Sequence, residues 1–212
     1  SFHICLVDDN SYKRLMPDWG YEPNKTPEPV MEHARKLAMI RLLRIYGGMT
    51  VPPSFLCLRN LDELFHNSLT SNVDMFVCEE INNSSLSNSE YVTGISVMGC
   101  KQNSSSMKEL EIIYSQSIRK DFTMNIELSG EISNVCDKLI KHGNVSRVNS
   151  ELLGIRNRDG KRIGVEELLG NSHLDISTHA YGILIPSNDI LKRTSYQWFA
   201  RMSGEQVLSS NT

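Results

Sequence analysis

Hydrophobic residues along this chain form short uninterrupted runs that alternate with longer stretches of helical spacing. Continuous apolar runs at 2–7, 55–58, 73–78 and 181–185 predict strands that are buried on both faces. A weaker alternation of apolar and polar residues at 94–100 predicts one more strand. The first of these runs ends at a pair of aspartates, as expected where a buried strand reaches polar surroundings.

Helical stretches are marked by apolar residues three or four positions apart and by residues suited to helix ends. Gly47 is a suitable terminator for the longest stretch. Ser106 and Glu109 have the spacing of a capping box, which predicts a helix start at Ser106. The predicted helices are 31–46, 61–65 with Asn60 as its cap, 106–120, 132–141 and a last one that begins after Ser187 and contains Trp198 and Phe199. Both aromatic residues are core anchors or, alternatively, a platform for stacking a sugar.

Alternation of strands and helices predicts the α/β class, with one domain over residues 1–212. We expect the early strands to lie parallel, with helices on both faces of their sheet. A hairpin is predicted at 152–165 around the turn 157–160, so the sheet should be mixed. The segment 82–88 is rich in Ser and Asn and predicts a surface loop. Because the first residue is Ser1, we expect the chain to be cut from a longer protein.

Composition narrows the classes of partner. The net charge of −3 and the pI near 6.1 show no basic footprint, so no nucleic-acid partner is expected. The apolar stretch 37–45 is broken by Arg41 and Arg44, and no segment reaches the roughly 18 apolar residues of a membrane span. The five cysteines have no CxxC spacing, which favours buried free thiols in a reducing compartment.

The stretch 37–64 carries the most specific pattern, LAMIRLLRIYGGMTVPPSFLCLRNLDEL. It predicts a helix, a Gly-Gly turn, a strand and a short helix. This arrangement resembles the GT-A-fold glycosyltransferases with a DXD sugar-binding region, of the capsular-polysaccharide-synthesis type. The resemblance covers about residues 2–65, including the segments 3–9 and 17–19. It implies a GT-A-like (Rossmann-like) mixed sheet flanked by helices.

The resemblance also shows what this chain lacks. In the family, two carboxylates at i and i+2 hold one divalent ion, which neutralises the diphosphate of the sugar nucleotide. Pro52 and Ser54 stand at those degenerate DXD positions. In the preceding helix, Arg35, Lys36 and Met39 stand where the family has its Ser-Asp-x-x-Arg residues. Loss of four charged positions predicts that metal-dependent sugar transfer has been lost.

Four residues remain as candidates for donor binding, namely Asp9, Lys36, Gly47 and Gly48. Asp9 lies at the end of a predicted strand, where α/β proteins bind ligands. It could hold a metal or a ribose, or it could be a solvated loop residue. Lys36 could grip a phosphate in place of the missing ion, or it could lie on a solvated helix face.

Two further readings of the charged residues stay open. Asp9 and Glu79 together could form a displaced metal site. Arg35 could grip a phosphate beside Lys36, or belong to the same solvated helix face. No pattern assigns a catalytic residue or a metal ligand.

Our first hypothesis is therefore a degenerate glycosyltransferase-like domain without a cofactor. It would serve as a structural or recognition module, with other subunits or other domains of a larger chain as partners. Members of the family occur in large DNA viruses, so a virus particle is one setting, beside a reducing cytoplasmic compartment. The alternative is an active metal-independent glycosyltransferase that binds a nucleoside-diphosphate sugar donor. A third hypothesis is that the resemblance is only architectural.

Overall fold

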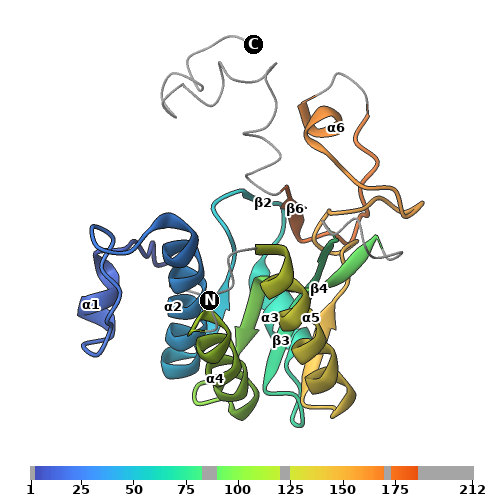
Figure 1. The fold of residues 1–212 in the computed structure, drawn as a ribbon. Helices are drawn as coiled ribbons and strands as arrows, with labels where there is room; N and C mark the ends of the chain where they lie inside the picture. Colours follow the sequence, from blue (N-terminus) through green and yellow to red (C-terminus); the bar gives the residue numbers. More distant parts are fainter. Residues whose placement is uncertain (1–2, 83–89, 120–124, 170–172, 186–212) are drawn as a thin grey trace. The chain divides into compact units, whose positions relative to one another are not determined.

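The computed structural model describes residues 3–82, 90–119, 125–169 and 173–185, and Figure 1 shows their fold. The chain forms two compact units. Unit 1 comprises Ser1–Pro52 and Asn60–Asn149, and unit 2 comprises Pro53–Arg59 and Ser150–Thr212.

Unit 1 contains a four-stranded mixed sheet with the strand order β1-β4-β3-β5. Strand β4 runs antiparallel to both β1 and β3, whereas β3 and β5 are parallel. The prediction of a mixed sheet flanked by helices is thus confirmed. The expectation that the early strands lie side by side and parallel is wrong, because residues 3–7 form no strand and Phe55–Cys57 pairs with Gly182–Leu184 in a separate sheet. The strands are β1 (Gly48–Thr50), β3 (Met75–Ile81), β4 (Tyr91–Cys100) and β5 (Val145–Val148).

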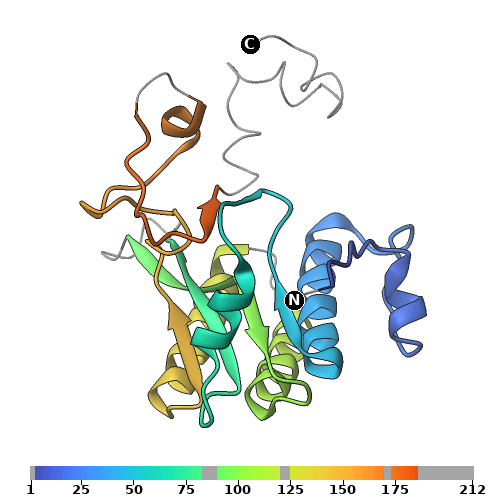
Figure 2. The ribbon, with the colours of Figure 1, turned by 180° about the vertical axis from the view of Figure 1, so that it is seen from behind.

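Helices cover both faces of this sheet, as the opposite views of Figures 1 and 2 show. One face carries the main hydrophobic core, where Met75, Val77 and Met98 pack against three long helices. On the other face Phe65 of a short helix meets Phe76 of β3 edge-on, with 6.2 Å between ring centroids. The three long helices are α2 (Glu28–Tyr46), α4 (Ser105–Arg119) and α5 (Asn125–Lys141), and the short one is α3 (Leu61–Ser68).

The first predicted strand is wrong. Residues 3–7 form no regular secondary structure, and Ile4 and Leu6 are 98% and 92% exposed. Only Val7 packs against the core. An apolar run becomes a buried strand only if neighbouring strands accept its backbone groups, and no described strand pairs with residues 3–7. After them, Asp8 accepts hydrogen bonds from Ser11 at the start of α1 (Ser11–Leu15).

Helix ends differ from the predictions mostly by a few residues. The predicted cap Ser106 is wrong, because α4 already begins at Ser105 and Ser106 is buried inside its first turn. The hydroxyl of Ser104 accepts the N–H of Met107 at 3.0 Å instead. Asn60 does cap α3, accepting the N–H of Asp62 at 3.0 Å.

Unit 2 contains a two-stranded antiparallel sheet of β2 (Phe55–Cys57) and β6 (Gly182–Leu184), with the short helix α6 (Val165–Leu169). Ile163, Val165, Ile183 and Ile185 form its own small core. The predicted hairpin is confirmed around 157–160, with Arg156 and Arg162 as a bridge pair. The last predicted helix, with Trp198 and Phe199, and most of the loop 82–88 lie outside the described residues.

Candidate functional site

The glycine turn, Gly47–Gly48, ends α2 and begins β1. Gly47 has φ +72° and ψ −174°, and Gly48 has φ +99°, regions that residues with a side chain rarely adopt. A Cβ on Gly47 would lie 2.9 Å from the backbone N of Gln102. The two glycines therefore have a structural reason to be here, independent of any ligand.

The last carbonyls of α2 are satisfied by the turn that follows β4. Gly47 donates its N–H to Leu43 at 2.7 Å, Asn103 donates its N–H to Arg44 at 2.8 Å, and the Gln102 amide donates to Ile45 at 3.0 Å. Carbonyl groups at a helix C-terminus need such donors. The glycine turn allows this close approach, which joins the end of α2 to the sheet.

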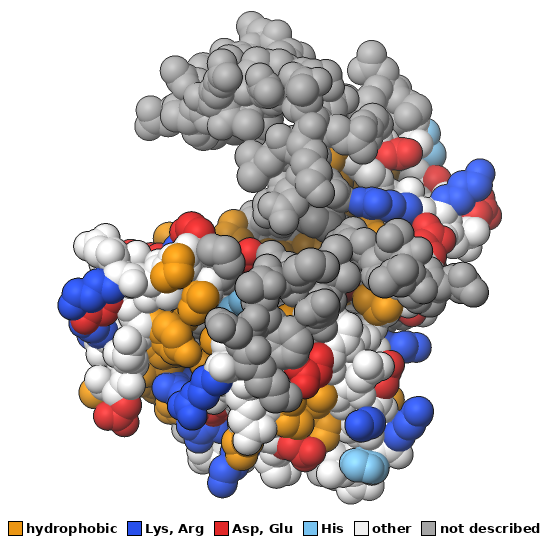
Figure 3. Space-filling view, viewed as in Figure 1, with side chains coloured by type: hydrophobic (Ala, Val, Ile, Leu, Met, Phe, Trp, Pro, Cys, Tyr) orange, Lys and Arg blue, Asp and Glu red, His pale blue; other side chains and the backbone are white. Residues whose placement is uncertain are grey.

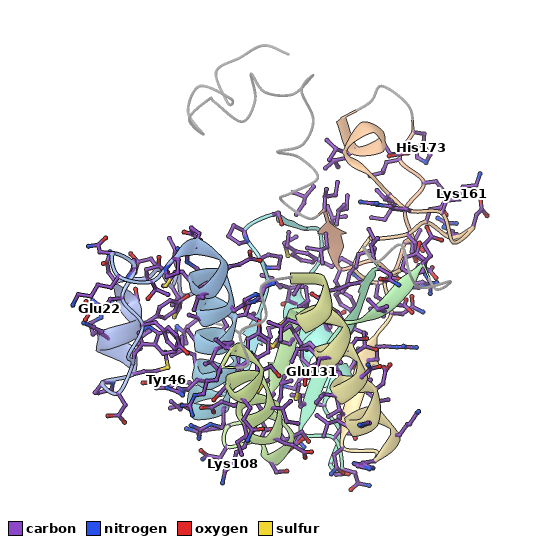
Figure 4. The ribbon with its side chains drawn as sticks, in the orientation of Figure 1. Glu22, Tyr46, Lys108, Glu131, Lys161 and His173 are labelled. Carbon is purple, nitrogen blue, oxygen red and sulfur yellow. The ribbon has the colours of Figure 1, made fainter. Side chains whose placement is uncertain are left out.

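Tyr46, the residue before the glycines, extends toward the N-terminal segment (Figure 4). Its hydroxyl donates a hydrogen bond to the carbonyl of Leu15 at 3.1 Å, although the residue is 57% exposed. The Tyr-Gly-Gly sequence thus links α2 with both α1 and the sheet.

Pro52 and Ser54, the positions at which the resemblance predicts a degenerate DXD motif, belong to different units. Pro52 is the last residue of the first segment of unit 1, and Ser54 belongs to unit 2. Neither side chain provides a carboxylate, so these positions lack the ligand type that binds Mg²⁺ or Mn²⁺.

Asp9 is held by Arg35 of α2. The Arg35 guanidinium donates to the Asp9 carboxylate through Nε at 2.9 Å and through Nη2 at 2.9 Å, in the two-pronged geometry of a strong ion pair. Arg35 also donates to Glu28 at 3.1 and 3.2 Å. The hydrogen bonds that Arg35 donates to Asp9, and then those to Glu28, raise the pKa of Arg35 above its ordinary value. Asp9 and Arg35, each a candidate for ligand binding, thus bind each other.

Lys36 contacts Glu32 one turn earlier on the same helix, with 3.3 Å between Nζ and Oε1. This pair is almost half exposed on both sides. Its geometry is that of an ordinary i,i+4 surface pair, worth about 0.3–0.5 kcal/mol.

The other two arginines of α2 converge on one carboxylate of α4. Arg41 and Arg44 donate to separate oxygens of Glu111, at 2.8 and 2.5 Å, and Glu111 is 13% exposed. The Arg41 guanidinium also lies 5.8 Å from the ring centroid of Trp19. These arginines therefore fasten α4 and the N-terminal segment to α2.

Glu79 lies on β3, paired in register with Thr93 of β4. No cluster of three or more His, Cys, Asp or Glu that could hold a metal is found in the described part of the chain. Likewise, no helix among the described residues has the length and apolar character for crossing a membrane.

Glu80, which the sequence pattern did not single out, lies at an irregularity in the pairing of β3 with β4. The pairing shifts between Phe76 and Cys78, so that Cys78 stands opposite Gly94. The Glu80 carboxylate fills the space beside Gly94 and accepts the N–H of Ser96 at 2.5 Å. Gly94, the first residue of the predicted strand 94–100, is the signal in the sequence that such a bulge leaves.

Near this bulge a second chain of hydrogen bonds links three elements. The Thr93 hydroxyl donates to Asp137 of α5 at 2.5 Å, and Arg147 of β5 donates to the same hydroxyl at 3.4 Å. Thr93 is 2% exposed. These contacts satisfy buried polar groups and join α5 to the sheet.

Three of the cysteines are buried as predicted, namely Cys78, Cys100 and Cys136, whereas Cys5 and Cys57 are exposed. Burial, followed by the nearby Asp137 and Glu80 charges, raises the pKa of Cys136 to about 12. Burial, followed by the nearby Asp74 charge, raises the pKa of Cys100 to about 12. Thiols in such surroundings stay protonated and are poor nucleophiles.

Comparisons of this chain with protein-family models, with curated proteins and with solved structures found no match.

Proposed function

We propose that this chain is a degenerate glycosyltransferase-like module without metal-dependent sugar transfer. In this proposal it has a structural or recognition role in a larger assembly, with other protein subunits or domains as partners. A virus particle is one such setting, on the strength of the sequence resemblance alone.

The observation that carries the proposal is the ion pair between Asp9 and Arg35. A donor-binding Asp9 or a phosphate-gripping Arg35 would have to break a two-pronged pair that also includes Glu28. A ligand would have to compensate for the loss of these internal partners, which lowers its net binding free energy. Lys36, with its own partner Glu32, supports the same conclusion.

Sequence positions add a second line of support. Pro52 and Ser54 offer no carboxylate, and the glycine turn has packing reasons for its glycines. The glycine turn and the pair of Asp9 and Arg35 thus have roles in holding the fold. A module of this kind contributes shape and surface to its assembly and leaves catalysis to other components.

Donor turnover is the direct test. Purified chain is incubated with UDP-glucose, UDP-galactose and GDP-mannose, with and without Mn²⁺, and released nucleoside diphosphate is measured. We expect release no faster than in the protein-free control. Release that requires the chain and is abolished by Asp9→Ala would overturn the proposal.

Calorimetry with UDP and GDP tests the metal-independent alternative. We expect no binding heat, because Lys36 and Arg35 already have carboxylate partners. Binding without metal that is weakened by Lys36→Ala, but not by the matched surface variant Lys108→Ala on α4, would instead support an active, metal-independent transferase.

A further inference from the structure

We draw no further inference here: the strongest candidate, the exposed apolar segment 3–7 of unit 1, in which Ile4 and Leu6 are 98% and 92% exposed (hydrophobic side chains are orange in Figure 3), carries nothing because no contact in the described part of the structure shows what covers it.

Discussion

At the scale of single residues, the glycine turn shows how a sequence motif can have a structural cause. Tyr46, Gly47 and Gly48 were the strongest support for the resemblance, and their contacts explain them through packing alone. Gly47 lets the turn after β4 approach the end of α2, and Tyr46 reaches the carbonyl of Leu15. Residues that a backbone shape requires are informative about a fold whether or not they also take part in chemistry.

Gly47→Ala should destabilise the chain by about 1–3 kcal/mol, because the added methyl meets Gln102 and the backbone lies in a region almost confined to glycine. Urea denaturation followed by circular dichroism measures the change. The control is Gly130→Ala in α5, where nothing lies within 4 Å of the new Cβ, and a gain of up to about 1 kcal/mol is expected. Equal stability of Gly47→Ala and the unmodified chain would contradict the packing explanation.

At the scale of elements, one of the two groups that cap the start of α4 comes from a distant part of the sequence, whereas the other is the neighbouring Ser104. Asp74, just before β3, accepts hydrogen bonds at 2.8 Å from the N–H of Ser105 and at 3.0 Å from its hydroxyl. Local spacing pointed to Ser106 and Glu109 instead. A cap supplied across 31 residues leaves no local pattern in the sequence.

Asp74→Ala should lower the free energy of unfolding by about 1–2 kcal/mol through loss of this cap. Partial burial raises the pKa of Asp74, but the serine hydrogen bonds outweigh it and hold the pKa below its ordinary value of 3.8. The stability from the carboxylate is therefore full above that ordinary value and is lost as the pH falls through the lower folded-state pKa.

Urea denaturation of the unmodified chain and of Asp74→Asn at several pH values checks this sign. Asparagine keeps an acceptor but not the charge, so the two proteins should differ by about 0.3–1 kcal/mol at neutral pH and converge as the pH falls through the lowered folded-state pKa of Asp74. A difference that grows as the pH falls would contradict the assignment.

The prediction of a strand at 2–7 is a second error at the scale of elements, and it has a different cause. The run at 2–7 has the composition of a buried strand, yet Ile4 and Leu6 are exposed. The hydrophobicity of this run indicates only that burial of its side chains would be favourable. Whether a strand forms depends on partners for its backbone groups, which composition cannot specify.

At the scale of the whole molecule, each of the two units consists of two separate stretches of the sequence. Unit 2 takes residues 53–59 from the middle of the chain and combines them with the part after 149. Inside this unit Gly154, with φ +59°, lies against the backbone of Gly182 in β6. Each unit has its own core, so each should have its own local stability.

Gly154→Ala should loosen unit 2 selectively, because a Cβ there would lie 2.4 Å from the Gly182 carbonyl oxygen. Hydrogen-exchange mass spectrometry should show faster exchange at 55–57 and 182–184, with unchanged exchange at 75–81. Gly20→Ala, where nothing lies within 4 Å of the new Cβ, is the control. Equal acceleration in both units would mean that they unfold as one.

Sequence alone determined the α/β class, the helix that ends at Gly47, the cap at Asn60 and the hairpin around 157–160. These features depend on residues close together along the chain, where periodicity and turn chemistry are legible. Tertiary structure alone decided the strand directions, the distant cap from Asp74 and the pairing of Asp9 with Arg35. Those depend on contacts between residues far apart in sequence, for which a single sequence has no local record.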